Sequence, residues 1–164
     1  MTVSVAAPVP LDATHIVDEF SCGEPILDVW LRHRAMNNHV RGASRTFVAA
    51  GADGRVYGYY ALAASTLTHE AATGAIRRNM PEPIPAMLLA RLAVDYRAQG
   101  QKLGASLLRD AYQRVAIIAQ HAGVRALLVN ALNERAKAFY MHYGFKQSPV
   151  QSSTLMLPIQ SIGH

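Results

Sequence analysis

The chain has one cysteine, Cys22, among its 164 residues, so no internal disulfide can form. No apolar run is long enough to cross a membrane, and the N-terminus lacks the charged start and apolar core of a secretion signal. These absences favour a reducing, cytoplasmic location. Because 51% of the residues are apolar, a wholly disordered chain is also excluded. The length predicts one domain, residues 1–164, with a loosely held start at residues 1–11.

Acidic residues are in the minority. Sixteen Lys and Arg face eleven Asp and Glu, and the pI is about 9.7. This excess favours a polyanionic partner such as a nucleic acid, although many basic proteins bind none. Metal-ligating patterns are missing, because the seven histidines form no close pair with ligand spacing and no cysteine joins them. We therefore expect no metal site.

Hydrophobic periodicity and turn residues predict alternating helices and strands. Ser21 and Glu24 have the spacing of a capping box, and apolar residues follow at helical spacing as far as Met36. Asp53-Gly54 lies between two apolar runs and predicts a β-hairpin. The later segments are, in chain order, a proline-bearing loop with a short helix at 67–85, a strand at 86–95, a helix at 103–120, a strand at 124–130, a helix at 133–144 and a closing strand before 159. This order implies an α/β or mixed α+β sandwich, with parallel neighbouring strands in its second half.

The segment Gln99-Gly100-Gln101-Lys102-Leu103-Gly104 joins a predicted strand to an amphipathic helix. A helix entered through such a turn presents unsatisfied N–H groups and the positive end of its dipole, which suit a diphosphate. The spacing fits neither the dinucleotide-fold glycine pattern nor a P-loop. Taken alone, the stretch is better explained as an ordinary strand-to-helix turn.

Two segments together resemble the GNAT family of N-acetyltransferases: "RLAVDYRAQGQKLGASLLRDAY" and "GVRALLVNALNERAKAFYMHYGFK". The family's turn has Gln or Arg, two residues, Gly, one residue, then Gly or Ala, which here falls on Gln99, Lys102 and Gly104. The residues that match its next helix are Asn133, Ala136, Tyr140, Gly144 and Phe145. The resemblance covers about residues 45–158. It implies an α/β (α+β) GNAT fold, with a central twisted mixed sheet whose middle strands splay apart, and acetyl-CoA as co-substrate.

The resemblance also implies roles for residues. Tyr140 would donate a proton to the coenzyme A sulfur, whereas its spacing alone favours a core aromatic. The cofactor-binding set comprises Leu92, Ala93, Val94, Gln99, Gly100, Gln101, Lys102, Leu103, Gly104, Ala105 and Asn133. For Asn133 the alternative is a helix N-cap, which is compatible with cofactor binding. Lys102 stands where the family has glycine; it either adds a charged contact to the phosphate, or occupies a φ suited to glycine, or crowds the phosphate.

The whole chain also resembles one branch of that family, the TacT-like acetyltransferase toxins of type II toxin–antitoxin modules. The matching stretches include "FSCGEPILDVWL", "ATGAIRRNMPEPIP" and "LARLAVD". This resemblance implies acetyl transfer from acetyl-CoA to the α-amino group of aminoacyl-tRNA, which blocks translation. It further implies a ribbon-helix-helix antitoxin, a homodimer, and promoter DNA bound only by the toxin–antitoxin complex.

Arginines supply the basic surface that such a substrate needs. Arg77, Arg78 and Arg91 are predicted to bind tRNA, and the N-terminal arginines that add to this surface are Arg32, Arg34, Arg41 and Arg45. For each N-terminal arginine the alternative is solvated surface or an ion pair. For Arg91, a charge within an apolar strand, the alternative is a salt bridge to Asp95 or Glu82.

The predicted reaction needs little base catalysis. A free α-amine titrates near about 8, and the adjacent ester lowers this value, so much of the amine is neutral at cellular pH. The sequence agrees, since no acid pair or His–acid pair stands out. Two other readings remain open: an acetyltransferase for a small amine or a peptide N-terminus, and a non-catalytic acyl-CoA or partner-binding module that has lost its cofactor site through Lys102.

Overall fold

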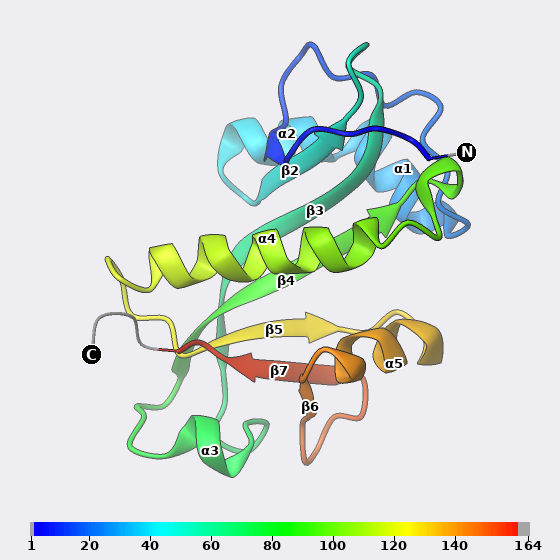
Figure 1. The fold of residues 1–164 in the computed structure, drawn as a ribbon. Helices are drawn as coiled ribbons and strands as arrows, with labels where there is room; N and C mark the ends of the chain where they lie inside the picture. The colour runs from blue at the N-terminus through cyan, green and yellow to red at the C-terminus, as the bar shows by residue number, and fades with distance from the viewer. Residues whose placement is uncertain (1, 161–164) are drawn as a thin grey trace. The chain divides into compact units, whose positions relative to one another are not determined.

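The computed structural model describes residues 2–160 and contains a seven-stranded sheet in the order β1-β2-β3-β4-β5-β7-β6 (Figure 1). The elements in chain order are β1 (Val9–Pro10), α1 (Pro25–His33), α2 (Ala35–Arg41), β2 (Arg45–Ala50), β3 (Val56–Leu67), α3 (Gly74–Arg77), β4 (Ile84–Val94), the 3₁₀-helix η1 (Tyr96–Ala98), α4 (Leu103–Ile118), β5 (Ala126–Asn130), α5 (Glu134–His142), β6 (Lys146–Gln147) and β7 (Thr154–Pro158). The predicted mixed α+β order is confirmed. Within residues 2–160, no helix is long and apolar enough to span a bilayer.

The chain divides into two compact units, the first comprising residues up to 63 together with 90–111. In this unit β2 and β3 pair antiparallel, with Thr46 opposite Ala61, and Gly54 in the turn has φ 87°. The hairpin predicted at Asp53-Gly54 is therefore confirmed. The apolar core here consists of Leu11, Phe20, Leu31, Ala35, Val48, Val56, Tyr59 and Ala93.

The predicted capping box is wrong. Helix α1 begins at Pro25, with Glu24 at the N-cap and no side-chain cap hydrogen bond. Proline at the first helical position has a preset φ and loses no helical hydrogen bond, so it fixes the start four residues after Ser21. The backbone N–H of Ser21 instead donates to Asp95 at 3.0 Å. The helix is also shorter than predicted, because Arg34 leaves helical geometry (φ −123°) and separates α1 from α2.

The predicted loosely held start is also wrong for the described residues 2–11. The N–H of Ala6 donates to the carbonyl of Ala50 at 2.9 Å, and that of Leu11 donates to Thr46 at 2.9 Å. The open edge of β2 offers unpaired backbone groups, and Val9 pairs opposite Val48 to cover it. Leu11 then enters the core at 5% exposure. The apolar residues in this segment therefore act as an edge strand.

Helix α4 packs its first turns closely on β3. Leu107, Ala111 and Val115, which recur at helical spacing, are buried, whereas Ile118 at the end of the helix is exposed. Gly58 permits this approach, because a Cβ at that position would lie 2.9 Å from Cδ1 of Leu107. Because Gly58 has no side chain, the start of α4 can lie close to the sheet.

The second unit comprises residues 64–89 together with those from 112 onwards. Here β4 pairs parallel with β5, with Ala86 opposite Ala126, which confirms the predicted parallel neighbours. Strand β7 runs antiparallel beside β5 (Figure 1), with Met156 opposite Leu128. The short helix predicted in the proline-bearing loop is α3. The core of this unit consists of Leu67, Ala71, Ala72, Ile76, Ile84, Ala86, Ala126, Leu128 and Met156.

Candidate active site

The turn between η1 and α4 has glycine-like backbone at two positions. Gly100 has φ 86° and Lys102 has φ 64°. Left-handed residues in a turn are one way in which proteins direct successive N–H groups at an anion. The first turn of α4 carries no acidic residue, and the Lys102 side chain is exposed. The interpretation that Lys102 occupies a φ suited to glycine is confirmed, and no carboxylate in the first helical turn opposes an anion.

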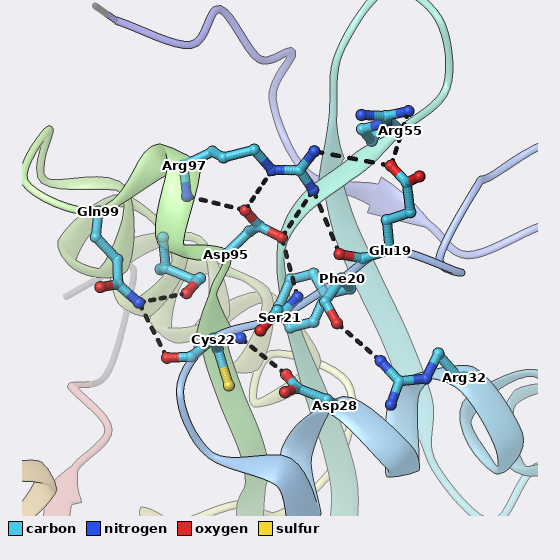
Figure 2. Close-up of polar contacts among 11 residues, drawn as sticks. Glu19, Phe20, Ser21, Cys22, Asp28, Arg32, Arg55, Asp95, Arg97 and Gln99 are labelled. Carbon is cyan, nitrogen blue, oxygen red and sulfur yellow. Dashed lines mark hydrogen bonds and ion pairs between the residues drawn. The ribbon is translucent and has the colours of Figure 1, made fainter.

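Both glutamines of the turn use their side-chain amides on the protein backbone. Nε2 of Gln99 donates to the carbonyl of Cys22 at 3.0 Å and to that of Val94 at 2.9 Å (Figure 2). Gln101 donates to the carbonyl of Val3 at 2.7 Å and accepts from its N–H at 3.0 Å. Within residues 2–160, no protein group accepts a hydrogen bond from the backbone N–H groups of residues 100–105, which fits a diphosphate ligand.

Asp95, directly after β4, is a fully buried carboxylate that accepts several hydrogen bonds. It accepts from the N–H of Ser21 at 3.0 Å and from the Arg97 N–H, Nε and Nη2 at 2.9, 2.9 and 3.0 Å (Figure 2). Burial alone would raise the pKa of Asp95, but the hydrogen bonds from Arg97 and Ser21 outweigh it and hold the pKa below its ordinary value. Glu19 in turn pairs with Arg55 at 3.1 Å. Sequence reasoning assigned Asp95 only a possible pairing with Arg91; its place between a strand and a predicted turn was the one available signal.

The last residues of β4 lie beside this network. Ala93 is buried, while Leu92 and Val94 are half-buried. Arg91 places its guanidinium 5.1 Å from the ring centroid of Trp30. Its Nη1 donates to Ala90 at 3.0 Å, and its Nε is buried without a partner among the described residues.

The salt-bridge alternative for Arg91 is wrong. Asp95 pairs with Arg97 at 2.9 Å, and Glu82 accepts from the N–H of His69 at 2.9 Å. A cation over an aromatic face is stabilised by the ring quadrupole, so Trp30 takes the place of a carboxylate.

Two predicted residues belong to helix α5 in the second unit. Asn133 is its N-cap, and its Oδ1 accepts from the N–H of Ala136 at 2.9 Å. The Tyr140 ring is buried, with edge contacts to Phe139 and Phe145 at centroid distances of 5.2 and 5.4 Å. Burial raises the pKa of Tyr140, so the phenol stays protonated at neutral pH. Within residues 2–160, no hydrogen-bond partner meets its hydroxyl, which leaves this O–H able to donate to a ligand.

The two adjacent arginines of the basic loop around α3, Arg77 and Arg78, have different environments. Arg77 is exposed, yet its Nη1 donates to the carbonyl of Ala72 at 3.1 Å. The loop is also tied by Arg125, which donates to the carbonyls of Ala75 and Ile76 at 2.9 and 3.0 Å. Arg78 is exposed and makes no ion pair or hydrogen bond within the described chain. The loop is therefore ordered, with Arg77 serving its backbone and Arg78 facing solvent.

Other candidate groups do not form a second centre. Burial and the neighbouring Asp28 raise the pKa of the Cys22 thiol to about 12, so it is not a thiolate at neutral pH. Among residues 2–160, no three His, Cys, Asp or Glu side chains gather as metal ligands do. Three of the four N-terminal arginines bond to protein groups: Arg32 to Phe20, Arg41 to Asn37 and Arg45 to His39.

Several known proteins are similar to this chain. The chain is 51% identical over 152 residues to a tRNA-acetylating toxin of Mycobacterium tuberculosis, covering 93% of this chain and 91% of that protein. AtaT complexed with acetyl-methionyl-tRNAfMet is 29% identical, with TM-score 0.87 and coverage of 94% and 95%.

Two further AtaT structures show other complexes. A tyrosine-to-phenylalanine variant bound to the C-terminus of the antitoxin AtaR and acetyl-CoA is 29% identical, with TM-score 0.80 and coverage of 95% and 94%. The AtaT–AtaR complex bound to DNA is 29% identical, with TM-score 0.77 and coverage of 94% and 95%. Residues 42–147 match the family model described as the acetyltransferase (GNAT) domain. The chain therefore belongs to the GNAT family of acetyltransferases.

Proposed function

We propose that this protein is a toxin that transfers an acetyl group from acetyl-CoA to the α-amino group of aminoacyl-tRNA, blocking translation until a cognate antitoxin neutralises it. The observation that carries the proposal is 51% identity to a tRNA-acetylating toxin over 93% of the chain. We further propose that residues 1–164 act as one acetyltransferase domain in the cytoplasm, where charged tRNA is made.

The donor side of the proposal rests on the turn. The residues that would hold the diphosphate through backbone N–H groups are Gln99, Gly100, Gln101, Lys102, Leu103, Gly104 and Ala105. Two left-handed residues and the start of a 16-residue helix fit this role. Leu92, Ala93 and Val94 at the end of β4, with Asn133, would hold the pantetheine arm. Acetyl-CoA, when bound, supplies the thioester whose acetyl group moves to the amine. The N–H of Ala93 or Val94 would stabilise charge on the thioester oxygen.

Tyr140 is our candidate general acid. It would protonate the departing thiolate, and its raised pKa keeps the required proton on the phenol at neutral pH. An acid placed to protonate a leaving group contributes about 10²–10⁴ in rate. The incoming amine is largely neutral, so this chain needs no strong base.

The acceptor side of the proposal rests on the arginines. Arg78 is exposed on an ordered loop, and the half-buried Arg91 lies over Trp30 with no carboxylate partner in the described residues, so both suit phosphate contacts. Arg77 would contribute mainly by holding the loop. Binding through such contacts weakens steeply as salt rises, because each neutralised phosphate releases counterions.

Partners follow from the same resemblance. We propose a ribbon-helix-helix antitoxin, a homodimeric toxin, and promoter DNA bound only by the toxin–antitoxin complex. Complexes of AtaT with the antitoxin AtaR and with DNA support an antitoxin and DNA as partners. Chromatography with light scattering on toxin alone and with antitoxin tests these stoichiometries.

The decisive experiment incubates purified protein with labelled acetyl-CoA and charged tRNA. We expect label on the α-amine, and loss of about 10²-fold or more in rate for Tyr140→Phe with acetyl-CoA binding retained. Tyr143→Phe is the matched control, since that tyrosine follows the same helix and is exposed. Acetylation of a small amine or a protein N-terminus with charged tRNA left unmodified contradicts the proposal. Full activity in Tyr140→Phe removes Tyr140 from the chemistry.

A further inference from the structure

The glutamines of the diphosphate turn have side chains that face the protein. Gln99 bridges two carbonyls, those of Cys22 and Val94, which lie before α1 and at the end of β4. Gln101 makes a two-way amide contact with the backbone of Val3. Each glutamine therefore fastens the turn to chain far away in sequence, 77 and 98 residues upstream.

Between these anchors and buried Leu103, the residues Gly100 and Lys102 do little to hold the turn. Gly100 would meet nothing within 4 Å even with a Cβ, and Gly100 and Lys102 are both exposed. Left-handed φ at both positions gives a conformation that an unanchored chain populates poorly at a lysine. Ordering backbone costs conformational entropy, so a turn that is not already ordered must lose this entropy when a ligand binds.

We propose that the side chains of Gln99 and Gln101 are positioning groups: they clamp the turn through Cys22, Val94 and Val3, pre-order its backbone N–H groups for the diphosphate, and do not themselves contact the donor. The described N-terminal residues thereby become part of the donor site, although Val3 does not contact the ligand. This inference rests on the proposed use of the turn for acetyl-CoA.

The experiment compares two acetyl donors. S-Acetylpantetheine carries the same thioester as acetyl-CoA but lacks the diphosphate, so only acetyl-CoA reports on the turn. For Gln99→Met and Gln101→Met, which keep side-chain length and remove both amide contacts, we expect kcat/KM with acetyl-CoA to fall about 10-fold through KM. We expect kcat/KM with S-acetylpantetheine and the KM for charged tRNA to change less than about 2-fold. Gln113→Met, at an exposed glutamine of α4, is the matched control and should leave both donors unchanged.

Val3→Pro provides a milder variant should either methionine substitution unfold the protein. It removes the N–H that donates to Gln101 but keeps the Val3 carbonyl that accepts from it, and we expect a loss of about 3-fold with acetyl-CoA alone. An equal loss with both donors would show a merely structural role and overturn the inference, as would no loss with either. If wild-type protein used both donors equally well, the turn would not be the diphosphate site, and that part of the proposed function would fail.

Discussion

Lys102 differs from the family's usual glycine in two ways, the energetic cost of its left-handed backbone conformation and its side-chain charge. Replacing it by glycine tests the first. Lys102 has φ 64°, where an L-residue is disfavoured by about 1–2 kcal/mol. Glycine removes that penalty but makes the unfolded chain freer, which costs about 0.5–1 kcal/mol. We therefore expect Lys102→Gly to raise the free energy of unfolding by about 0.5–1 kcal/mol. In a chain of this length the melting temperature should rise by about 2 °C.

The charge of Lys102 acts separately from its backbone. Its exposed ammonium lies on the turn proposed to hold the diphosphate, where a charge-assisted contact that remains in solvent is worth about 1 kcal/mol. We expect Lys102→Gln, which keeps the Cβ, to weaken acetyl-CoA binding about 3–10-fold at low salt with little change in stability. The difference in acetyl-CoA affinity between the wild-type protein and Lys102→Gln should shrink at high salt only if charge is involved.

Thermal unfolding by calorimetry measures the stability of each variant. Titration of the same samples with acetyl-CoA at two salt concentrations measures the affinity. A Lys102→Gly protein less stable than Lys102→Gln would refute the reasoning from φ. Unchanged affinity in Lys102→Gln at low salt would show that the ammonium makes no contact with the donor. Loss of binding in Lys102→Gly alone would mean that the lysine, through its shape, holds the turn.

Three further predictions follow from the contacts. Because the pKa of Asp95 is lowered on folding, its ionisation stabilises the protein above the unfolded-state pKa of about 3.9, and this contribution is lost as pH falls through the lower folded value. In Asp95→Asn, the free energy of unfolding, measured by urea titration, should therefore fall less steeply as the solution is made acidic. Gly58→Val pushes a side chain onto the first turns of α4 and should lower the free energy of unfolding by about 1–3 kcal/mol, measured by denaturant titration. Arg78→Gln should reduce the salt dependence of tRNA binding by about one counterion, seen as a shallower slope of log affinity against log salt. Arg125→Gln should instead lower the free energy of unfolding, because it releases the α3 loop.

Much of the fold was predictable because its signals are local. Hydrophobic periodicity and the turn residues glycine and proline identified the β2–β3 hairpin, the 86–95 strand and helix α4 without tertiary information. Errors arose where long-range contacts decided the outcome. Ser21 has the spacing of a cap, but buried Asp95, 74 residues away, holds its N–H instead. Residues 2–11 look unstructured until the open edge of β2 is considered.

The site was harder to predict than the fold, because a residue type does not reveal which of its atoms is used. Gln99 matches the family pattern, yet its side-chain amide holds two backbone carbonyls, so in the proposed site the ligand would be recognised by backbone N–H groups and not by this side chain. The alternative considered for Arg91 was a carboxylate partner, but the face of Trp30, 61 residues earlier, meets the same electrostatic requirement without a negative charge. A guanidinium neutralised by a carboxylate would have less attraction left for phosphate, whereas one stacked on a ring keeps its full charge. The pairing that the sequence could not show is therefore the one that leaves Arg91 suited to a nucleic acid.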